Sequence, residues 1–395
     1  MQPMDLNQLV TLADAAGASD LHLQAGRPMA LRVAGKLRTQ GEPMPARVVD
    51  AIAREVLGAE GLPGFSERGS ADLALDVAGI RCRVNLLTTS RGTGLAIRLL
   101  SNGLVTVDTL NLHPELKQLV AHPHGLVLVT GPTGCGKSST LAALVQEVNL
   151  SRTAHIVTLE QPIEYDLLPI RAYIRQREVG RDTPSFAQGL LDATREDIDV
   201  LMVGEMRDRD TMRLVLDAAE TGHLVLATLH SSTPIEALQR IVSAFPASEQ
   251  PSVCAQLADV VQGVVTQRLT WLDGPALRVP ECEVLLGTQA VRAVLRKGEL
   301  FKLQTALETG GREGNWTLTR YRAWLQSKTD FHEPQPREDV APRRASPPRR
   351  DAAPAPETTA GGDGRRGEGE GDDDIWVIKP TDDTLGDVLG ELDKD

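Results

Sequence analysis

The first hundred residues show one helical pattern followed by several strand patterns. Apolar side chains recur at helical spacing between residues 6 and 13, which predicts an amphipathic helix near the N-terminus. The segments 19–26, 29–39 and 71–100 alternate apolar and polar residues and are separated by glycine-containing turns. Residues 1–100 are therefore predicted to form a small α+β domain.

The pattern changes at Gly125, where short apolar runs begin to alternate with helical segments. Continuous apolar runs occupy residues 125–131, 155–160, 199–205 and 223–230, and such runs are typical of buried parallel strands. Segments with helical periodicity follow or separate these runs. This alternation predicts a parallel sheet with helices on both faces.

Two further regions of the chain border or continue this domain. Residues 101–120 are interpreted as a linker with a short helix, and residues 234–325 as mainly helical by their periodicity. We therefore expect an α/β domain with C-terminal helices over residues 121–330.

The last part of the chain, residues 331–395, differs in composition from the rest. From His332 to Gly371 it is rich in Pro, Gly, Ala, Arg and Asp and nearly lacks large apolar side chains, which predicts disorder. The final segment, 372–395, combines acidic residues with an apolar run around Trp376, followed by a helical pattern. We predict that this segment docks onto a partner protein or packs back onto its own assembly.

Charge and length limit the class of protein. The net charge is −12, but the residues from Glu333 onward alone carry −8, so the body of the chain carries only −4. A nearly neutral body does not support nucleic-acid binding. The chain of 395 residues predicts two or three domains.

Other features of the sequence indicate a cytoplasmic protein. No apolar run approaches the ~20 residues that a membrane-spanning helix needs, and the N-terminus does not resemble a signal peptide. The four cysteines are widely spaced and form no CxxC pair, which argues against a disulfide framework and a zinc site.

A glycine-rich loop follows the first buried strand. The segment "GPTGCGKS" matches GxxxxGK[ST] and precedes a helical pattern, which is the context that a phosphate-binding loop requires. Backbone N–H groups of such a loop surround phosphate oxygens, while Lys137 would reach the β- and γ-phosphates and Ser138 would hold Mg²⁺. The predicted nucleotide-binding residues are Gly131, Pro132, Thr133, Gly134, Cys135, Gly136, Lys137, Ser138 and Ser139.

Polar residues at the ends of two other strands are candidates for catalysis. Glu205 ends the apolar run of residues 199–205, at the sheet edge where open α/β sheets bind ligands, and could polarise an attacking water molecule. His223 and His230 lie at the two ends of the next strand. His230, at the carboxyl end, is the better candidate for sensing the γ-phosphate.

The segment "TLEQPIEY" places Gln161 between two glutamates, Glu160 and Glu164. A glutamine can form hydrogen bonds but cannot carry charge or act as a base. Gln161 therefore keeps the length of an acid without its charge.

These motifs occur in an order that resembles the PilT/PilU family of type IV pilus retraction ATPases, in the secretion ATPase superfamily. The similarity rests on "GPTGCGKSST", "TLEQPIEY", "VLMVGEMRD" and "AAETGHLVLATLH", and it extends over about residues 1–327. It implies a PAS-like N-terminal domain followed by a RecA-like P-loop ATPase domain. It also assigns Glu205 to the Walker B position, and His223 and His230 to the His box. It places Glu164 at the acid of the Asp box that acts at the nucleotide, and Gln161, which stands where the family commonly has Asp, is then interpreted as a residue that adjusts the rate.

The resemblance further implies the biological setting. Members of this family are homo-hexamers that use ATP and Mg²⁺ to drive domain rotation against a platform protein of the inner membrane, at the base of the pilus machine. A paralogous retraction ATPase is a possible partner. Four arginines fall in the family's arginine-bearing N-domain strands and are candidate arginine fingers, although each is as easily an ordinary surface residue: Arg81, Arg83, Arg91 and Arg98.

Alternative functions remain open at this stage. Gln161 and the acidic tail are compatible with an ATP-binding regulator or accessory paralogue with weak hydrolysis. An extension or export ATPase is a third possibility, disfavoured by the short N-terminus and the absence of CxxC pairs.

Overall fold

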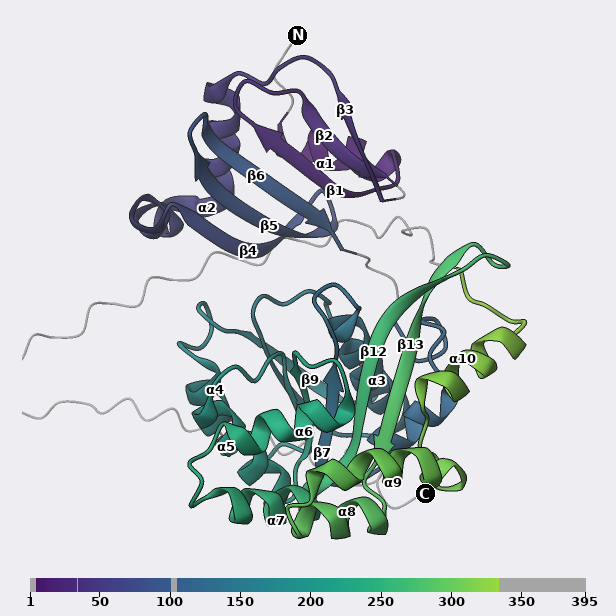
Figure 1. The fold of residues 1–395 in the computed structure, drawn as a ribbon. Coiled ribbons are helices and arrows are strands. Elements are labelled where there is room, and N and C mark those ends of the chain that lie inside the picture. The colour runs from purple at the N-terminus through teal and green to yellow at the C-terminus, as the bar shows by residue number, and fades with distance from the viewer. Residues whose placement is uncertain (1–4, 34, 101–104, 334–395) are drawn as a thin grey trace, which may run out of the picture. The chain divides into compact units, whose positions relative to one another are not determined.

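The computed structural model describes residues 5–33, 35–100 and 105–333 (Figure 1). The predicted tail from residue 334 onward, with the docking segment 372–395, lies outside the described residues. No helix in the described part of the chain is both long and apolar enough to cross a bilayer.

The N-terminal part is an α+β unit, as the alternating pattern predicted. Its elements are α1 (Leu6–Ala15), β1 (Ala18–Gln24), β2 (Met29–Val33), β3 (Lys36–Gln40), α2 (Ala46–Arg68), β4 (Ser70–Val77), β5 (Ile80–Thr89) and β6 (Gly92–Leu99). Among the described residues, these strands form one antiparallel sheet in the order β3-β2-β1-β6-β5-β4.

The start of α1 and the burial of its side chains follow from its sequence. The Asp5 side chain accepts a hydrogen bond from the Gln8 backbone N–H, and the Gln8 side chain accepts one from the Asp5 N–H, which forms a capping box. The apolar residues that predicted this helix are all buried: Leu6, Leu9, Val10 and Ala13. They pack with alternate residues of the strands in one hydrophobic core.

The second part, residues 105–333, is a three-layer α/β unit. Its first elements are η1 (Pro114–Val120), β7 (Gly125–Thr130), α3 (Lys137–Ser151), β8 (His155–Glu160), β9 (Tyr173–Glu178), α4 (Phe186–Ala193), β10 (Val200–Val203), α5 (Arg209–Glu220) and β11 (Leu224–Leu229). The remaining elements are α6 (Pro234–Ser243), α7 (Gln250–Val260), β12 (Val261–Leu272), β13 (Leu277–Leu286), α8 (Gln289–Arg296), η2 (Leu300–Lys302), α9 (Leu303–Thr309), η3 (Gly310–Glu313) and α10 (Leu318–Ser327).

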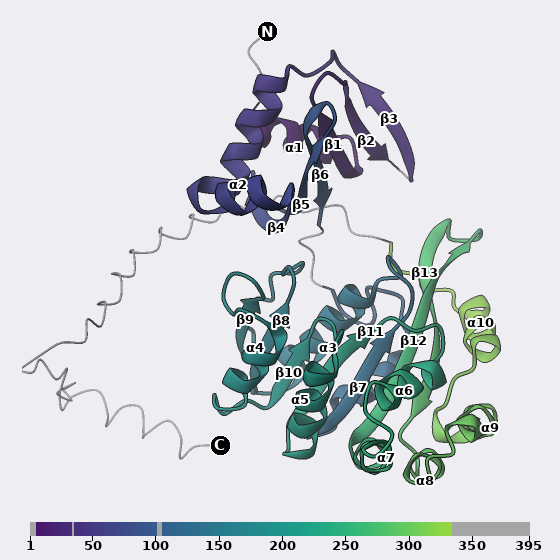
Figure 2. The same cartoon turned by 60° about the vertical axis from the view of Figure 1, so that its left-hand side comes forward.

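The sheet of this unit is parallel except at one edge. In the described residues its order is β13-β12-β7-β11-β10-β8-β9, and only the β12–β13 pair is antiparallel. Figure 2 shows β9 toward one end of this sheet and β13 at the other. Two separate hydrophobic clusters cover its two faces, one including α5 and α7 and the other including α3 and α10. The predicted parallel sheet with helices on both faces is therefore confirmed.

The region after Pro234 differs from the sequence-based expectation. We expected residues 234–325 to be mainly helical, but β12 and β13 form a long antiparallel hairpin within this range. Residues 261–267 of β12 and 279–285 of β13 are almost all buried, so exposed and buried positions do not alternate there. The helical periodicity of the flanking segments therefore dominated the prediction.

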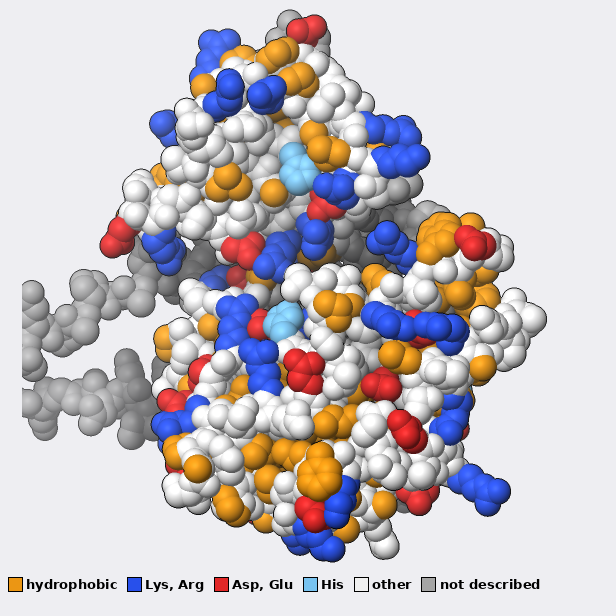
Figure 3. Space-filling model, in the orientation of Figure 1, with side chains coloured by type: hydrophobic (Ala, Val, Ile, Leu, Met, Phe, Trp, Pro, Cys, Tyr) orange, Lys and Arg blue, Asp and Glu red, His pale blue; other side chains and the backbone are white. Residues whose placement is uncertain are grey.

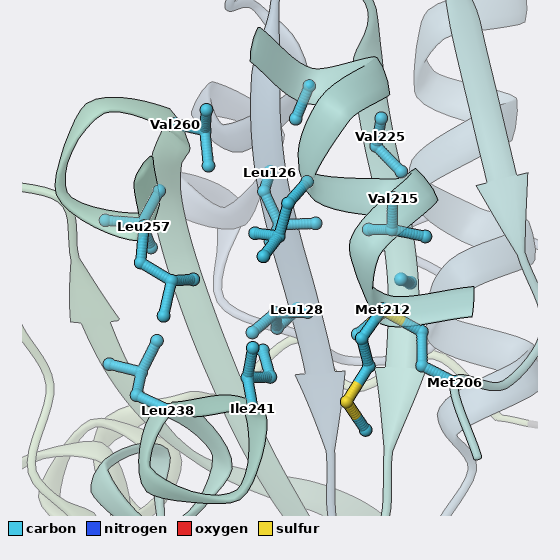
Figure 4. Packing of buried hydrophobic residues seen from close by; sticks show 14 of the residues in the cluster. Leu126, Leu128, Met206, Met212, Val215, Val225, Leu238, Ile241, Leu257 and Val260 are labelled. Carbon is cyan, nitrogen blue, oxygen red and sulfur yellow. The ribbon is translucent and has the colours of Figure 1, made fainter. Parts of the chain in front are cut away.

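The central strands carry the core of this unit. Leu126 on β7 is fully buried and packs between side chains of the helices on one face, including Val215 and Leu257 (Figure 4). The neighbours of Leu126 are buried side chains of the same sheet and helices. A cavity left by a smaller side chain at this position would therefore not be filled by groups from the surface.

Replacing this side chain is expected to destabilise the fold. Leu126→Ala should lower the free energy of unfolding by roughly 2–5 kcal/mol, the range for buried leucines. Chemical denaturation followed by circular dichroism measures this loss. Leu269→Ala, which truncates a leucine that is 40% exposed, should change the stability by less than about 0.5 kcal/mol. Equal effects of the two substitutions would contradict this placement of the core.

Candidate functional site

The glycine-rich loop lies between β7 and α3, at the carboxyl end of β7, an inner strand of the sheet that lies between β12 and β11. Gly131 has φ +142°, and a Cβ added there would meet the Gln267 carbonyl oxygen at 2.3 Å and the Cys135 Sγ at 2.7 Å. Gly134 and Gly136 also have positive φ, at +76° and +92°. The backbone therefore adopts a conformation and a close approach that side chains at these positions would prevent.

Lys137 begins α3 and extends back over this loop. Its Nζ donates to the carbonyl oxygens of Gly131 and Pro132 at 3.0 and 3.1 Å, and it lies 3.4 Å from Nδ1 of His230. The ammonium group is thus held beside the backbone that would surround a phosphate, where a γ-phosphate could replace the carbonyl contacts.

Gln267, a residue that the sequence did not single out, forms hydrogen bonds that hold the glycine-rich loop in place. Gln267, on β12, is buried, accepts a hydrogen bond from Thr140 Oγ1 at 2.8 Å, and donates one to the Cys135 carbonyl at 2.7 Å. One side chain therefore joins the loop and the first turns of α3. The sequence carried no signal for this role, because Gln267 lies in the segment that was interpreted as helical.

Glu205 and His230 meet at the carboxyl ends of two adjacent strands, β10 and β11. His230 Nε2 lies 3.2 Å from Glu205 Oε1, and Arg207 Nη2 lies 2.8 Å from Glu205 Oε2. Partial burial acts to raise the pKa of Glu205, but the hydrogen bond from Arg207 and the charges of Arg207, His230 and Lys137 outweigh it and lower that pKa. Glu205 is therefore held ionised, as a residue that orients water must be.

His223 does not join this group. It precedes the opposite end of β11, where its Nδ1 lies 2.9 Å from the Ala218 carbonyl oxygen and 3.3 Å from Thr221 Oγ1. Six residues of β11 separate it from the phosphate-binding edge, or about 20 Å of extended chain. His223 and His230 thus mark the two ends of a single buried strand.

The segment after β8 contacts α3 through a tyrosine. The Tyr165 hydroxyl lies 2.6 Å from Ser139 Oγ, next to the predicted Mg²⁺ ligand Ser138. Gln176 on β9 donates both to the Tyr165 carbonyl at 2.8 Å and to Glu160 Oε1 at 3.1 Å. A hydrogen-bonded chain therefore runs from β8 and β9 to the start of α3.

Three of the four candidate arginines form ion pairs with acidic residues. Arg83 pairs with Asp72 at 2.6 Å and with Glu164 at 3.0 Å. Arg81 pairs with Asp76 at 3.2 Å, and Arg98 with Asp20 at 3.0 Å. Arg91 is exposed in the turn before β6. Arg83 is therefore the candidate arginine that the structure brings to a predicted catalytic acid.

The Asp-box segment carries two acids with different surroundings. Glu164 is partly exposed, whereas Glu160 is buried and accepts hydrogen bonds from Thr158 at 2.7 Å and Gln176. Burial raises the pKa of Glu160 to about 7 and outweighs these hydrogen bonds, which lower it. Glu160 is thus a carboxyl group that is partly protonated near neutral pH.

This raised pKa predicts how the stability depends on pH. The folded state binds the Glu160 proton up to about pH 7, whereas an unfolded glutamate releases it near pH 4.3, so stability falls as pH rises from about 4 to about 7. Glu160→Gln should reduce this fall, by on the order of a few kcal/mol at most. Denaturation midpoints at pH 5.5 and 8.5 measure it; an unchanged pH dependence in the variant would contradict the assignment.

The arrangement fits a nucleoside triphosphate with its metal ion. The loop offers backbone N–H groups around a space that glycines keep open, and α3, a helix of 15 residues, begins at Lys137. Lys137, Ser138, Glu205 and His230 come from four positions on the same edge of the sheet. Hydrolysis of a phosphoanhydride is the chemistry that such a set can perform.

Comparison with known proteins identifies the family. The Type II/IV secretion system protein family matches residues 3–302. The type IV pilus retractation ATPase PilT of Pseudomonas aeruginosa is 39% identical over 317 residues, which cover 80% of this chain and 92% of that protein. The type IV pilus ATPase PilU of the same organism is 33% identical over 334 residues, covering 84% of this chain and 87% of that protein.

Solved structures give the same answer. A crystal structure of the pilus retraction motor PilT with bound ADP superposes with a TM-score of 0.73 at 35% identity, covering 83% of this chain and 98% of that one. The Legionella pneumophila ATPase DotB superposes with a TM-score of 0.71 at 25% identity, covering 83% of this chain and 93% of that one. The chain therefore belongs to the type II/IV secretion system protein family, as a PilT-like ATPase.

Proposed function

We propose that this protein hydrolyses ATP to power retraction of a type IV pilus. This proposal rests on the geometry of the site together with the similarity of the chain to a retraction ATPase. The phosphate-binding loop, Glu205 and His230 meet at one sheet edge, and the chain matches 92% of the length of the retraction ATPase PilT.

The proposed roles of the residues follow from their chemistry. The loop backbone and Lys137 bind the β- and γ-phosphates, and the Ser138 hydroxyl holds Mg²⁺, which supplies charge neutralisation when it is bound. Glu205, kept ionised by Arg207, orients the attacking water. His230 lies between Glu205 and Lys137, so its contacts change when Lys137 moves from the loop carbonyls to a phosphate.

The proposed assembly is a homo-hexamer that acts at the cytoplasmic face of the inner membrane, at the base of the pilus machine. Its partner there is the platform protein, against which hydrolysis-driven rotation does work. Arg83 is the arginine that we place nearest to the reacting phosphates, because it already pairs with Glu164. The domains proposed for these tasks are residues 1–100 and 121–330.

The proposal is tested by separating hydrolysis from retraction in cells. A strain lacking the gene should carry excess surface pili and lose twitching motility, and the wild-type gene should restore both. Glu205→Ala should not restore them, and its purified hexamer should hydrolyse ATP roughly 10²–10⁴-fold more slowly, the range for loss of a residue that acts in proton transfer or water activation.

The matched control is Glu299→Ala, which removes a partly exposed acid near the C-terminal end of the described chain. Among the described residues its carboxylate is paired with Lys302. It should hydrolyse ATP at the wild-type rate. Equal ATPase rates in the wild type, Lys137→Ala and Glu205→Ala would instead favour a regulator that binds ATP without using it. If the purified wild-type protein hydrolysed ATP normally but the strain lacking the gene still twitched, the protein would serve a secretion system other than the type IV pilus.

A further inference from the structure

Gln267 is a polar side chain that is buried at the point where β12 leaves the core. It is 1% exposed and ends a run of buried residues, whereas the next two residues, Arg268 and Leu269, are exposed. Figure 3 shows hydrophobic side chains on the surface beyond this point, at the end of the β12–β13 hairpin. A buried amide destabilises the fold unless protein groups replace the hydrogen bonds that it makes to water. The contacts of this amide therefore explain why the position is polar.

Both ends of the Gln267 amide are bound at the glycine-rich loop. Its Nε2 donates to the Cys135 carbonyl oxygen at 2.7 Å, and its Oε1 accepts from Thr140 Oγ1 at 2.8 Å. A carbonyl oxygen can only accept, so the amide nitrogen faces Cys135 and the amide oxygen is left for the Thr140 hydroxyl. Thr140, near the start of α3, is also 1% exposed. The bond from Thr140 thus fixes the rotation of the amide that binds the loop.

The bond to Cys135 sets the orientation of one peptide group of the loop. In a trans peptide the C=O and the following N–H point in opposite directions. Because the Cys135 carbonyl points at Gln267, the Gly136 N–H points away from it, and within the described residues this N–H has no hydrogen-bond partner. Glycine-rich loops of this kind turn such N–H groups toward phosphate oxygens. The Gln267 amide therefore orients a donor that is available to a phosphate.

The strand that carries this glutamine is held on both sides of it. Thr266 Oγ1 lies 2.6 Å from the Oγ1 of Thr130, the residue before the loop. On the other side, Arg268 Nε donates to Glu281 at 2.8 Å. Glu281 is 1% exposed and also accepts from Arg322 on α10 at 2.8 Å. The amide therefore reaches the loop from a fixed backbone, which is what a group that orients another group requires.

We propose that Gln267 is a positioning residue for nucleotide binding, whose amide holds the Cys135–Gly136 peptide with its N–H toward the β-phosphate. This inference rests on the proposed role of the glycine-rich loop as the nucleotide site. A donor that is already oriented binds a phosphate without a further loss of entropy for ordering the loop. Without the amide, this loss falls on the binding step of ATP and of ADP alike, because both carry a β-phosphate. Once the nucleotide is bound the contact is made, so the rate of the chemical step changes little.

Replacing the amide by a side chain of similar length tests this role in the full-length protein. Gln267→Met removes both hydrogen bonds and should raise the dissociation constants for ADP and for ATP by roughly tenfold each, as expected when a hydrogen bond to a charged group is weakened. The KM for ATP should rise by a similar factor, while kcat stays within about threefold of the wild-type value. Isothermal titration calorimetry measures the affinities, and steady-state phosphate release measures KM and kcat.

Thr266→Val is the matched control for a loss of stability. It removes a buried hydrogen bond from the adjacent residue of the same strand, but that bond joins β12 to β7 and not to the loop. It should lower the melting temperature about as much as Gln267→Met does and leave the affinity for ADP at the wild-type value. Equal weakening of ADP binding by the two variants, or unchanged ADP binding in Gln267→Met, would overturn the proposal.

A second variant tests the path through the amide and does not replace Gln267 itself. Thr140→Val frees the rotation of the amide and should weaken ADP binding by roughly threefold, less than Gln267→Met does. In the double variant the affinity should equal that of Gln267→Met alone, because Thr140 acts through Gln267. Additive effects would contradict this path.

Lys137→Ala separates the role of Gln267 from that of the loop. Equal ADP binding by the wild type and Lys137→Ala would overturn the assignment of the loop as the nucleotide site, and the proposal for Gln267 with it. Weakened binding in Lys137→Ala together with normal binding in Gln267→Met would overturn only the role of Gln267.

Discussion

Lys137→Ala should lower the rate of ATP hydrolysis by roughly 10²–10³-fold, the loss that follows removal of one group aimed at developing charge. The reason lies in the position of the ammonium group. It is held within 3.1 Å of two loop carbonyls and 3.4 Å from His230, so that a phosphate entering the loop meets a positive charge already in place. No other described cation makes these contacts with the loop.

The measurement is steady-state phosphate release by the purified assembly, with nucleotide affinity determined in parallel. Lys302→Ala is the matched control, because Lys302 pairs with Glu299 on the surface and lies outside the loop. It should hydrolyse ATP at the wild-type rate. If Lys137→Ala bound and hydrolysed ATP normally, the assignment of the loop as the nucleotide site would be wrong.

The helices and strands whose sequence pattern depends only on neighbouring residues were predictable from the sequence. The first helix has its apolar residues on one face and its capping box within four residues, and the central strands are continuous apolar runs. Each of these signals depends only on neighbouring residues. The β12–β13 hairpin was not predicted, because apolar and polar residues do not alternate along its buried parts. Its formation also depends on the pairing of β12 with β7, more than 130 residues earlier in the chain.

The candidate site divides in the same way. The loop was predictable from its glycine motif, and Glu205 was predictable because it directly follows an apolar run that indicates a buried strand. Gln267, which braces the loop, and Arg207, which lowers the pKa of Glu205, could not be assigned, because their roles arise from contacts that only the folded sheet creates. The sequence favoured His230 over His223 because His230 follows the carboxyl end of its strand, and in the structure the length of β11 separates the two histidines.

Glu164→Gln should nearly abolish hydrolysis, with a loss of roughly 10²-fold or more, whereas Gln161→Asp should change the rate by less than about tenfold. Glu164 is the acid of its segment that an arginine contacts, and glutamine preserves its size while removing its charge. Gln161 is exposed, and its side chain makes no hydrogen bond in the described structure that would link it to the loop. A charge added there therefore acts only from a distance.

The decisive result is the ranking of the two variants in the same phosphate-release assay. Asp166→Asn, which neutralises the exposed acid that directly follows this segment, separates a specific effect of Glu164 from a general effect of lost negative charge. We expect it to hydrolyse ATP close to the wild-type rate. If Gln161→Asp lowered the ATPase rate more than Glu164→Gln did, residue 161 and not residue 164 would be the position of this segment that acts in catalysis. The glutamine found there would then itself be what sets the rate of this ATPase, because it cannot serve as a base.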